Sequence, residues 1–261
     1  MRKVVTCAVG SLVVLAAVPA LANERRLTQT YESLVLEPGV KELELWVSPR
    51  IGRADYYVRF DNRVELELGL TDRLLTALYL NFSMRQAGAP RVDSLEGSVS
   101  SEWKLKLADP VADPVGLAVY AEGTFATTEA ELEGKLIVDK RFDALLLAFN
   151  ASVEHEWASE DGQAVRELSL VQSLGVSYEV TQRFSVGLEA LDKMVFAEDG
   201  LRAGIYGGPV ASYAGDGWWA AFSLTPQVAS HKPSGVADHA ERVDLVENER
   251  FIGRLLVGFH I

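Results

Sequence analysis

The sequence predicts an all-β protein, a single transmembrane antiparallel up-and-down β-barrel of about twelve strands. Apolar and polar side chains alternate with period two along most of the chain, which is typical of strands with two different faces. After Asn23 no run of eighteen apolar residues follows, so residence in a membrane would require a barrel. Short turns alternate with longer polar loops, which is the connection pattern of such barrels.

The first 22 residues have the pattern of an export signal. A basic start at Arg2 and Lys3 precedes an apolar run from Val4 to Val18 and the small-x-small sequence Ala20-Leu21-Ala22. The run is short for an uncleaved spanning helix, which needs about 20 residues. We therefore predict a cleavable signal peptide at 1–22 and a barrel domain at 23–261, with the protein in the cell outer membrane.

The composition excludes several classes of protein. Removal of Arg2 and Lys3 with the signal changes the net charge from −12 to −14, so nucleic acid is not expected as a partner. A hydrophobic content of 48% excludes disorder. The single cysteine, Cys7, lies in the predicted signal, so the mature chain has neither a disulfide framework nor a thiol nucleophile.

The clearest strand begins at Arg63, where the alternation has no exception through Leu70. The turn Gly-Leu-Thr-Asp-Arg at 69–73 joins it to a second alternating stretch, which predicts a tight hairpin. Alternating faces recur to the end of the chain, at 43–47, 64–70, 74–82, 95–107, 115–121, 132–138, 145–153, 168–178, 184–190, around 205, 218–224 and 255–261. Each stretch has roughly the length that a tilted spanning strand needs.

Connection lengths favour a membrane barrel over a soluble sandwich. Compact turns are expected at 69–73, 108–114, 139–143, 180–183 and 214–217, and longer loops at 48–57, 83–93, 158–165, 192–200 and 229–248. The connection at 126–129 is the exception, because it is short. The even strand number places both termini on the side of the short turns, which is the periplasmic side.

Aromatic residues gather near the ends of the predicted strands, as in the girdles of membrane barrels. The expected membrane-interface aromatics are Trp46, Tyr57, Phe82, Trp103, Trp157, Tyr178, Phe184, Trp218 and Phe259. A soluble sandwich would place the same residues in its core.

The face opposite the apolar one would line the lumen, and it carries more acidic than basic side chains. The candidate lumen residues are Glu42, Glu44, Arg63, Glu65, Glu67, Glu102, Lys104, Glu131, Glu133, Lys135, Glu179, Glu189 and Arg254. Two readings stay open: a water-filled pore that favours cations, or a salt-bridged, hydrated plug in a barrel of intermediate width.

Catalysis and metal binding have weak support. His155 falls on the outward face near the outer rim, but no serine motif accompanies it, so we predict no enzyme activity. His231, Asp238 and His239 share the longest loop without a tight ligand spacing, so we predict no metal site and no cofactor. Glu131 and Glu133 could be read as an acid/base pair, although their spacing suits a lumen lining better.

The stretches Lys41–Tyr57 and Asp61–Leu74 resemble those of uncharacterised bacterial outer-membrane barrels, loosely similar to the transporters grouped with the meta-pathway of phenol degradation. The turn-like Val180-Thr-Gln-Arg-Phe is similar to their periplasmic turns. This resemblance implies passage of small or hydrophobic compounds through the outer membrane, and it brings no functional residues with it.

The leading hypothesis is a passive channel for small solutes with an acidic lumen. Its expected partners are the lipid bilayer, small solutes and the outer-membrane assembly machinery that would insert it. The alternatives are a non-conducting structural or binding barrel whose last long loop recognises a partner, and a soluble periplasmic ligand-binding β-protein.

Overall fold

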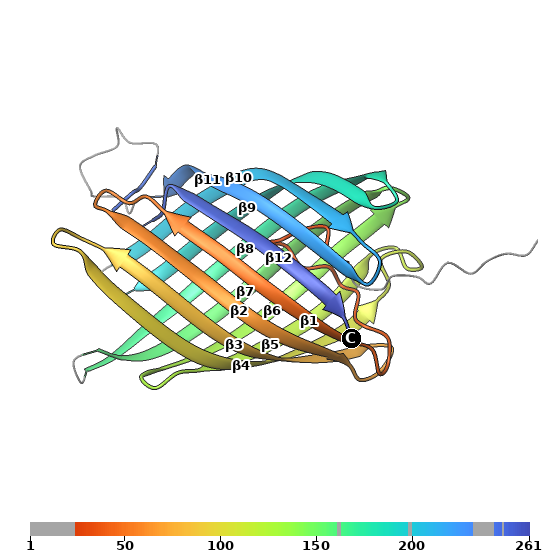
Figure 1. Ribbon diagram of the computed structural model, residues 1–261, viewed down its shortest axis with the longest axis horizontal. Coiled ribbons are helices and arrows are strands. Elements are labelled where there is room, and N and C mark those ends of the chain that lie inside the picture. Colours follow the sequence, from red (N-terminus) through yellow and green to blue (C-terminus); the bar gives the residue numbers. More distant parts are fainter. Residues whose placement is uncertain (1–23, 161–162, 198–199, 232–242, 247) are drawn as a thin grey trace, which may run out of the picture.

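The computed structural model describes residues 24–160, 163–197, 200–231, 243–246 and 248–261. Twelve strands in these ranges form one closed barrel, in which each strand pairs with its neighbours in the sequence and β1 closes the ring with β12 (Figure 1). The strands are β1 Lys41–Ile51, β2 Tyr57–Gly69, β3 Leu74–Ala87, β4 Val92–Ala108, β5 Gly116–Phe125, β6 Glu129–Phe142, β7 Leu145–Glu160, β8 Gln163–Thr181, β9 Phe184–Ala197, β10 Gly200–Ala214, β11 Trp218–His231 and β12 Phe251–His260. All pairings are antiparallel, which confirms the predicted fold class.

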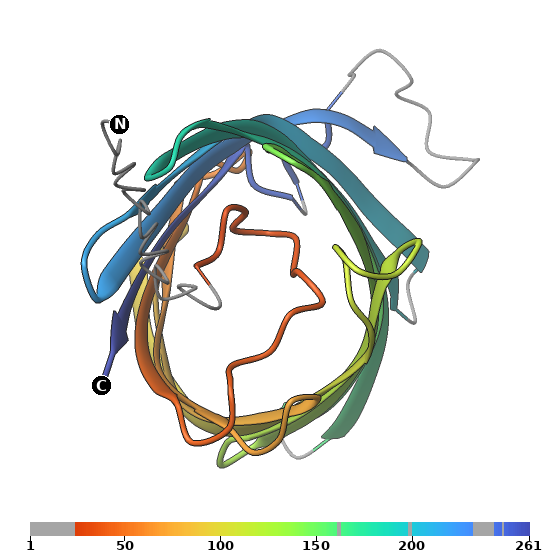
Figure 2. The same ribbon diagram turned by 90° about the vertical axis from the view of Figure 1, so that its right-hand side faces the viewer.

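The barrel has two different ends. We call the end where β1 begins and β12 finishes the termini end; it is the right-hand end in Figure 1 and faces the viewer in Figure 2. The connections there are residues 70–73, 109–115, 143–144, 182–183 and 215–217. In the second of them, backbone N–H groups of Ala112 and Val111 donate to the Asp109 carboxylate and lower its pKa.

At the opposite end, which we call the loop end, strands occupy most of the predicted loops. β3 continues to Ala87, and β7 and β8 leave only residues 161–162 between them. β8 has 19 residues, more than the roughly 9–11 that span a bilayer. The alternation is less regular there: Met84 and Phe196 keep apolar side chains on the outside, whereas in β8 the successive residues Arg166 and Glu167 are both charged, although the backbone pairing goes on. The connection 232–250 is long, as predicted.

Large apolar side chains cover the outside of the barrel. Leu78, Leu174 and Leu188 lie in the middle of their strands and are 62%, 58% and 59% exposed. An apolar belt of this kind on a closed barrel is the surface that contacts lipid in membrane barrels. No helix of the described residues is long and apolar enough to cross a bilayer.

The buried residues form no ordinary core between layers. Residues 24–40, which we call the N-terminal segment, precede β1 and run inside the ring of strands, where Figure 2 shows them in red and orange. Leu27, Thr28, Ser33 and Leu36 of this segment are fully buried. The apolar clusters of the interior form where the segment meets the barrel wall.

Candidate functional site

Leu27 fixes the start of the N-terminal segment to the wall. Its side chain packs against Leu146, Ala148 and Val210 of β7 and β10. Beside them Gly175 of β8 leaves the necessary room, because a Cβ there would lie 2.4 Å from Leu27 Cδ1. A wall position without a side chain thus forms part of the pocket for Leu27.

Glu189 of β9 binds the backbone of the segment. Its Oε1 accepts the N–H groups of Thr28, Gln29 and Thr30 at 3.1, 2.8 and 2.9 Å, and its Oε2 accepts the Thr28 hydroxyl at 2.8 Å. Three successive N–H groups around one carboxylate form charge-assisted hydrogen bonds, the stronger class of such bonds. This wall carboxylate therefore holds the peptide chain.

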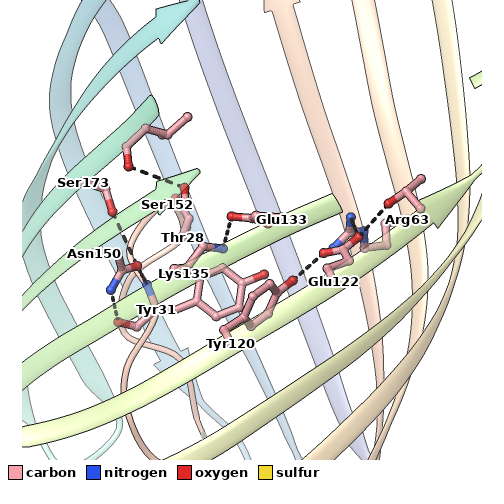
Figure 3. A network of polar contacts seen from close by, with 12 residues as sticks. Thr28, Tyr31, Arg63, Tyr120, Glu122, Glu133, Lys135, Asn150, Ser152 and Ser173 are labelled. Carbon is pink, nitrogen blue, oxygen red and sulfur yellow. Dashed lines mark hydrogen bonds and ion pairs between the residues drawn. The ribbon is translucent and has the colours of Figure 1, made fainter. Parts of the chain in front are cut away.

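Two further wall residues satisfy the backbone of the segment. The amide of Asn150 in β7 accepts the Tyr31 N–H at 2.6 Å and donates to the Tyr31 carbonyl at 3.0 Å (Figure 3). Asp139 of β6 accepts the Ser33 N–H at 3.2 Å. In a strand, these backbone groups would bond to the backbone of a neighbouring strand. Here side chains of the wall satisfy them, because an unpaired buried backbone group is costly.

Charged side chains of the segment pair with the wall. Arg26 Nη2 lies 2.6 Å from Glu179 Oε2, and Glu32 pairs with Arg141. Arg254 of β12 donates to the Thr28 carbonyl at 3.2 Å. Contacts from β6, β7, β8, β9 and β12 therefore surround the segment on several sides.

Aromatic rings and cations form a layer across the lumen at Tyr31. Its ring lies 5.5 Å from that of Tyr120 and 6.4 Å from that of Trp46, between centroids. Lys135 Nζ lies 4.1 Å from the centroid of the Tyr31 ring and 4.2 Å from that of the Tyr120 ring (Figure 3). The Arg63 guanidinium lies 5.0 Å from the centroid of the Trp46 ring. Cation–π contacts of this kind stabilise a desolvated layer.

A cavity of about 520 Å³ lies on the loop-end side of this layer, and Gln29 and Tyr31 of the segment line it. A second space of about 10 Å³ lies on the other side and is lined by Tyr31, Glu24, Arg25 and Glu32, also of the segment, with wall residues. Residues of the N-terminal segment therefore line both spaces, between the outer cavity and the termini end.

The outer cavity has walls of opposite charge. One wall, formed by β12, β1 and β2, carries Arg254, Arg50, Arg59 and Arg63, while β6 and β7 carry Glu129, Glu131, Glu133, Glu154 and Glu156. The strand order places β6 and β7 across the ring from β1. Some charges pair within a wall, as Lys135 does with Glu133 at 2.9 Å, and some pair across strands, as Arg63 does with Glu122 at 3.1 Å.

The register aligns glutamates in a row across four strands. Glu102 of β4 lies opposite Glu122 of β5, which lies opposite Glu133 of β6, which lies opposite Glu154 of β7. Like charges on directly opposite residues destabilise a sheet unless other groups compensate them. Arg63 compensates Glu122 and Lys135 compensates Glu133, so the row depends on these two cations of the lumen.

The predicted lumen residues lie on the inner face and fall into three groups. Glu42, Glu44, Glu65, Glu67, Glu102 and Lys104 are buried on the termini side of the segment; Glu179 and Glu189 bind the segment; and Arg63, Glu131, Glu133, Lys135 and Arg254 line the outer cavity. The structure thus has a cavity on the loop-end side of the segment and buried charged residues on the termini side.

Two of the predicted interface aromatics are corrected by the structure. Trp46 is 6% and Tyr57 is 7% exposed, and both lie on the inner face, Trp46 bonded to Glu44 Oε2 at 2.7 Å and Tyr57 under the Arg53 guanidinium at 4.0 Å. Alternate residues of a strand point to the same face, so Trp46 shares the inner face with Glu44, and Tyr57 shares it with Arg63. This alternation outweighs the preference of aromatic residues for the membrane interface. The remaining predicted aromatics are exposed on the outer face: Phe82, Trp103, Trp157, Tyr178, Phe184, Trp218 and Phe259.

The histidine candidates gain no catalytic or metal partner set from the described residues. The His155 ring stacks on Trp157, with centroids 4.1 Å apart. His231 ends β11, and Asp238 and His239 lie outside the described residues.

The N-terminal segment was not predicted from the sequence and stayed unassigned within the barrel domain. The available signal was an absence of strand period before Lys41, combined with isolated apolar residues at 27 and 31 and a short apolar run at 34–36. Such a stretch is too apolar for a simple linker and too irregular for a strand.

Comparison with known proteins places the fold among outer-membrane barrels. The COG4313 outer membrane channel from Pseudomonas putida F1 aligns with a TM-score of 0.67 at 11% identity, over 90% of this chain and all of that one. The translocator domain of autotransporter NalP from Neisseria meningitidis aligns at 0.56 and 10%, over 87% and 90%, and the NanC porin at 0.53 and 12%, over 84% and 100%. No curated protein matches the chain. A family model described as "Family of unknown function (DUF6662)" matches residues 19–261.

Proposed function

Because the chain belongs to the family of unknown function DUF6662, whose description carries no activity, we propose a function from the lumen: an outer-membrane channel for small solutes, closed in this conformation by its N-terminal segment. One observation carries this proposal. The floor of the outer cavity includes Gln29 and Tyr31 of a peptide segment that hydrogen bonds and packing hold in place. A floor of this kind can leave without any strand of the wall being broken.

The membrane assignment rests on the apolar belt. Side chains such as Leu78 and Leu174 would be exposed to water in a soluble protein, and the fold is that of outer-membrane barrels. We propose that the signal at 1–22 exports the chain and that the outer-membrane assembly machinery inserts it.

We propose that the open channel favours small cations. The row from Glu102 to Glu154 would face the bore once the segment leaves, and carboxylate rings set cation preference in channels. The arginines of the facing wall would orient polar solutes that carry charge at both ends. The narrower resemblance to transporters of the phenol meta-pathway stays a prediction about the solute.

Planar-bilayer recording tests the proposal with two forms of the mature protein. The intact barrel should conduct rarely, and a variant that lacks residues 24–36 should conduct steadily with a preference for K⁺ over Cl⁻. Deletion of 232–242 is the matched control and should leave conductance as in the intact protein.

A folded 24–36 deletion variant that never conducts would refute the channel and favour the non-conducting binding barrel. In that case the 232–242 deletion should abolish partner binding instead. Heat-modifiable migration of each variant on SDS gels would establish that the barrel has folded.

A further inference from the structure

Five glutamates form a buried cluster on the termini side of the N-terminal segment, outside the outer cavity. They are Glu42, Glu44, Glu65, Glu67 and Glu102, whose exposed fractions are 0, 0, 1, 5 and 1%. The register places Glu42 directly opposite Glu67, and Glu44 directly opposite Glu65. Buried like charges in such pairs are strongly unfavourable without counter-charges.

The neighbouring donors satisfy only part of this cluster. Trp219 Nε1 donates to Glu42 Oε1 at 3.0 Å, His260 Nε2 lies 2.7 Å from Glu42 Oε2, and Trp46 Nε1 donates to Glu44 Oε2. The cationic neighbours are Arg25, 3.9 Å from Glu44 Oε2, and Lys104. Arg63 also lies near Glu65 and Lys135 near Glu102, but these two cations form their ion pairs with Glu122 and Glu133, outside the cluster.

Several buried oxygens of the cluster accept no hydrogen bond from any described residue. They are Glu44 Oε1, Glu65 Oε2 and Glu102 Oε2, each on a side chain that is at least 99% buried. An unpaired buried carboxylate oxygen costs more than a neutral one, so its site is incomplete without a ligand.

Three of the glutamates converge on one point. Glu42, Glu44 and Glu67 each present a carboxylate oxygen, and these three atoms lie within 4.8 Å of one another. We propose that Glu42, Glu44 and Glu67 bind one Ca²⁺ ion, with Glu65 and Glu102 adding negative charge around it.

The donor set selects the type of ion. All three ligands are carboxylate oxygens, which hard cations prefer, whereas Zn²⁺ sites favour nitrogen and sulfur. Mg²⁺ demands near-ideal octahedral geometry and keeps several waters, whereas Ca²⁺ accepts mono- or bidentate carboxylates in flexible geometry, which suits three side chains whose positions the strand register fixes.

Calorimetric titration of CaCl₂ into the EDTA-washed mature protein, folded in detergent, tests the site. We expect one Ca²⁺ per chain, at least tenfold weaker binding in Glu44→Gln and in Glu67→Gln, and weaker binding of MgCl₂. Glu131→Gln is the matched control, because Glu131 belongs to a second acidic group, with Glu129 and Glu156, that is more exposed in the outer cavity. This control should bind Ca²⁺ as the unaltered protein does.

Thermal unfolding keeps the test decisive where a variant folds poorly. The proposal expects Ca²⁺ to raise the midpoint of the unaltered protein and EDTA to reverse the rise. Absence of saturable Ca²⁺ uptake at millimolar concentration would overturn it, as would uptake that Glu44→Gln and Glu67→Gln leave unchanged. A raised midpoint in Glu67→Gln without any Ca²⁺ effect would mean that the cluster holds protons instead. None of these outcomes depends on conductance, so the calcium site can be refuted without refuting the channel proposal, and the reverse also holds.

Discussion

At the scale of single residues, the fit of the N-terminal segment in the lumen depends on glycines of the wall as well as on polar side chains. Gly175 makes room for Leu27, and Gly116 makes room for Ser33, since a Cβ at Gly116 would lie 2.5 Å from Ser33 Oγ. The wall also supplies single polar groups at defined points, of which Glu189, with four donors from the segment, is the most heavily used. The fit between wall and segment is therefore specific.

Gly175→Val should displace Leu27 from its pocket and favour the open channel. Removal of a buried leucine from its pocket costs about 1.5–3 kcal/mol, so the closed-to-open ratio should fall roughly tenfold to a hundredfold. Open probability in planar bilayers measures the effect. Gly134→Val is the control, because a Cβ at Gly134 meets no atom within 4 Å, and it should leave gating unchanged. An equal open probability in both variants would show that the packing of Leu27 does not help to close the channel.

At the scale of elements, the strands and the N-terminal segment differ in what the sequence reveals of them. Contact with lipid on one face imposes period two, so alternation predicted most of the strands, whereas the glycine-rich β10 could be placed only around Ile205. The strand extensions at the loop end lack that constraint and were predicted as loops. The segment has no period, and its partners lie far along the chain, so local pattern could not place it.

A disulfide between the segment and β11 should lock the channel closed. Thr28 Oγ1 and Ser223 Oγ lie 2.6 Å apart and both residues are fully buried, so cysteines at both positions are within bonding reach. The only natural cysteine is Cys7, in the predicted signal. The double variant Thr28→Cys/Ser223→Cys should lose its rare openings under oxidising conditions and regain them with a reductant.

The single variants Thr28→Cys and Ser223→Cys control for the substitutions themselves. Neither should respond to the reductant. Openings of the oxidised double variant at the frequency of the single variants would contradict closure by the segment.

At the scale of the whole molecule, the usual arrangement of a soluble protein is inverted. The outer surface is apolar, and the interior holds charges, cations stacked on aromatic rings and a peptide segment. The glutamate row and the buried cluster both lie inside, together with the arginines and lysines that pair with some of them. Alternation along each strand predicts which charges face the lumen, but whether opposite charges meet across it depends on strand order.

Leu174→Arg should weaken folding into lipid vesicles by about 2–4 kcal/mol, as arginine does near the midplane on the outer face of a barrel. Urea titration of vesicle-embedded protein measures this free energy of unfolding. Val111→Arg is the control, because Val111 is 66% exposed in a turn at the termini end and its substitution should cost less than 1 kcal/mol. Recovery of the unaltered protein in the soluble periplasm would refute the lipid-facing assignment altogether.

The position of the N-terminal segment also orders the events of folding. Its bonds reach residues 106–161 positions away, on β6, β7 and β9, although it is synthesised before any strand. Such distant contacts form late, because chain entropy is lost before they are gained. The segment is continuous with β1, which also forms half of the final β1–β12 seam. The segment can therefore take its place in the lumen only after the strands that bind it have formed, although it precedes all of them in the sequence.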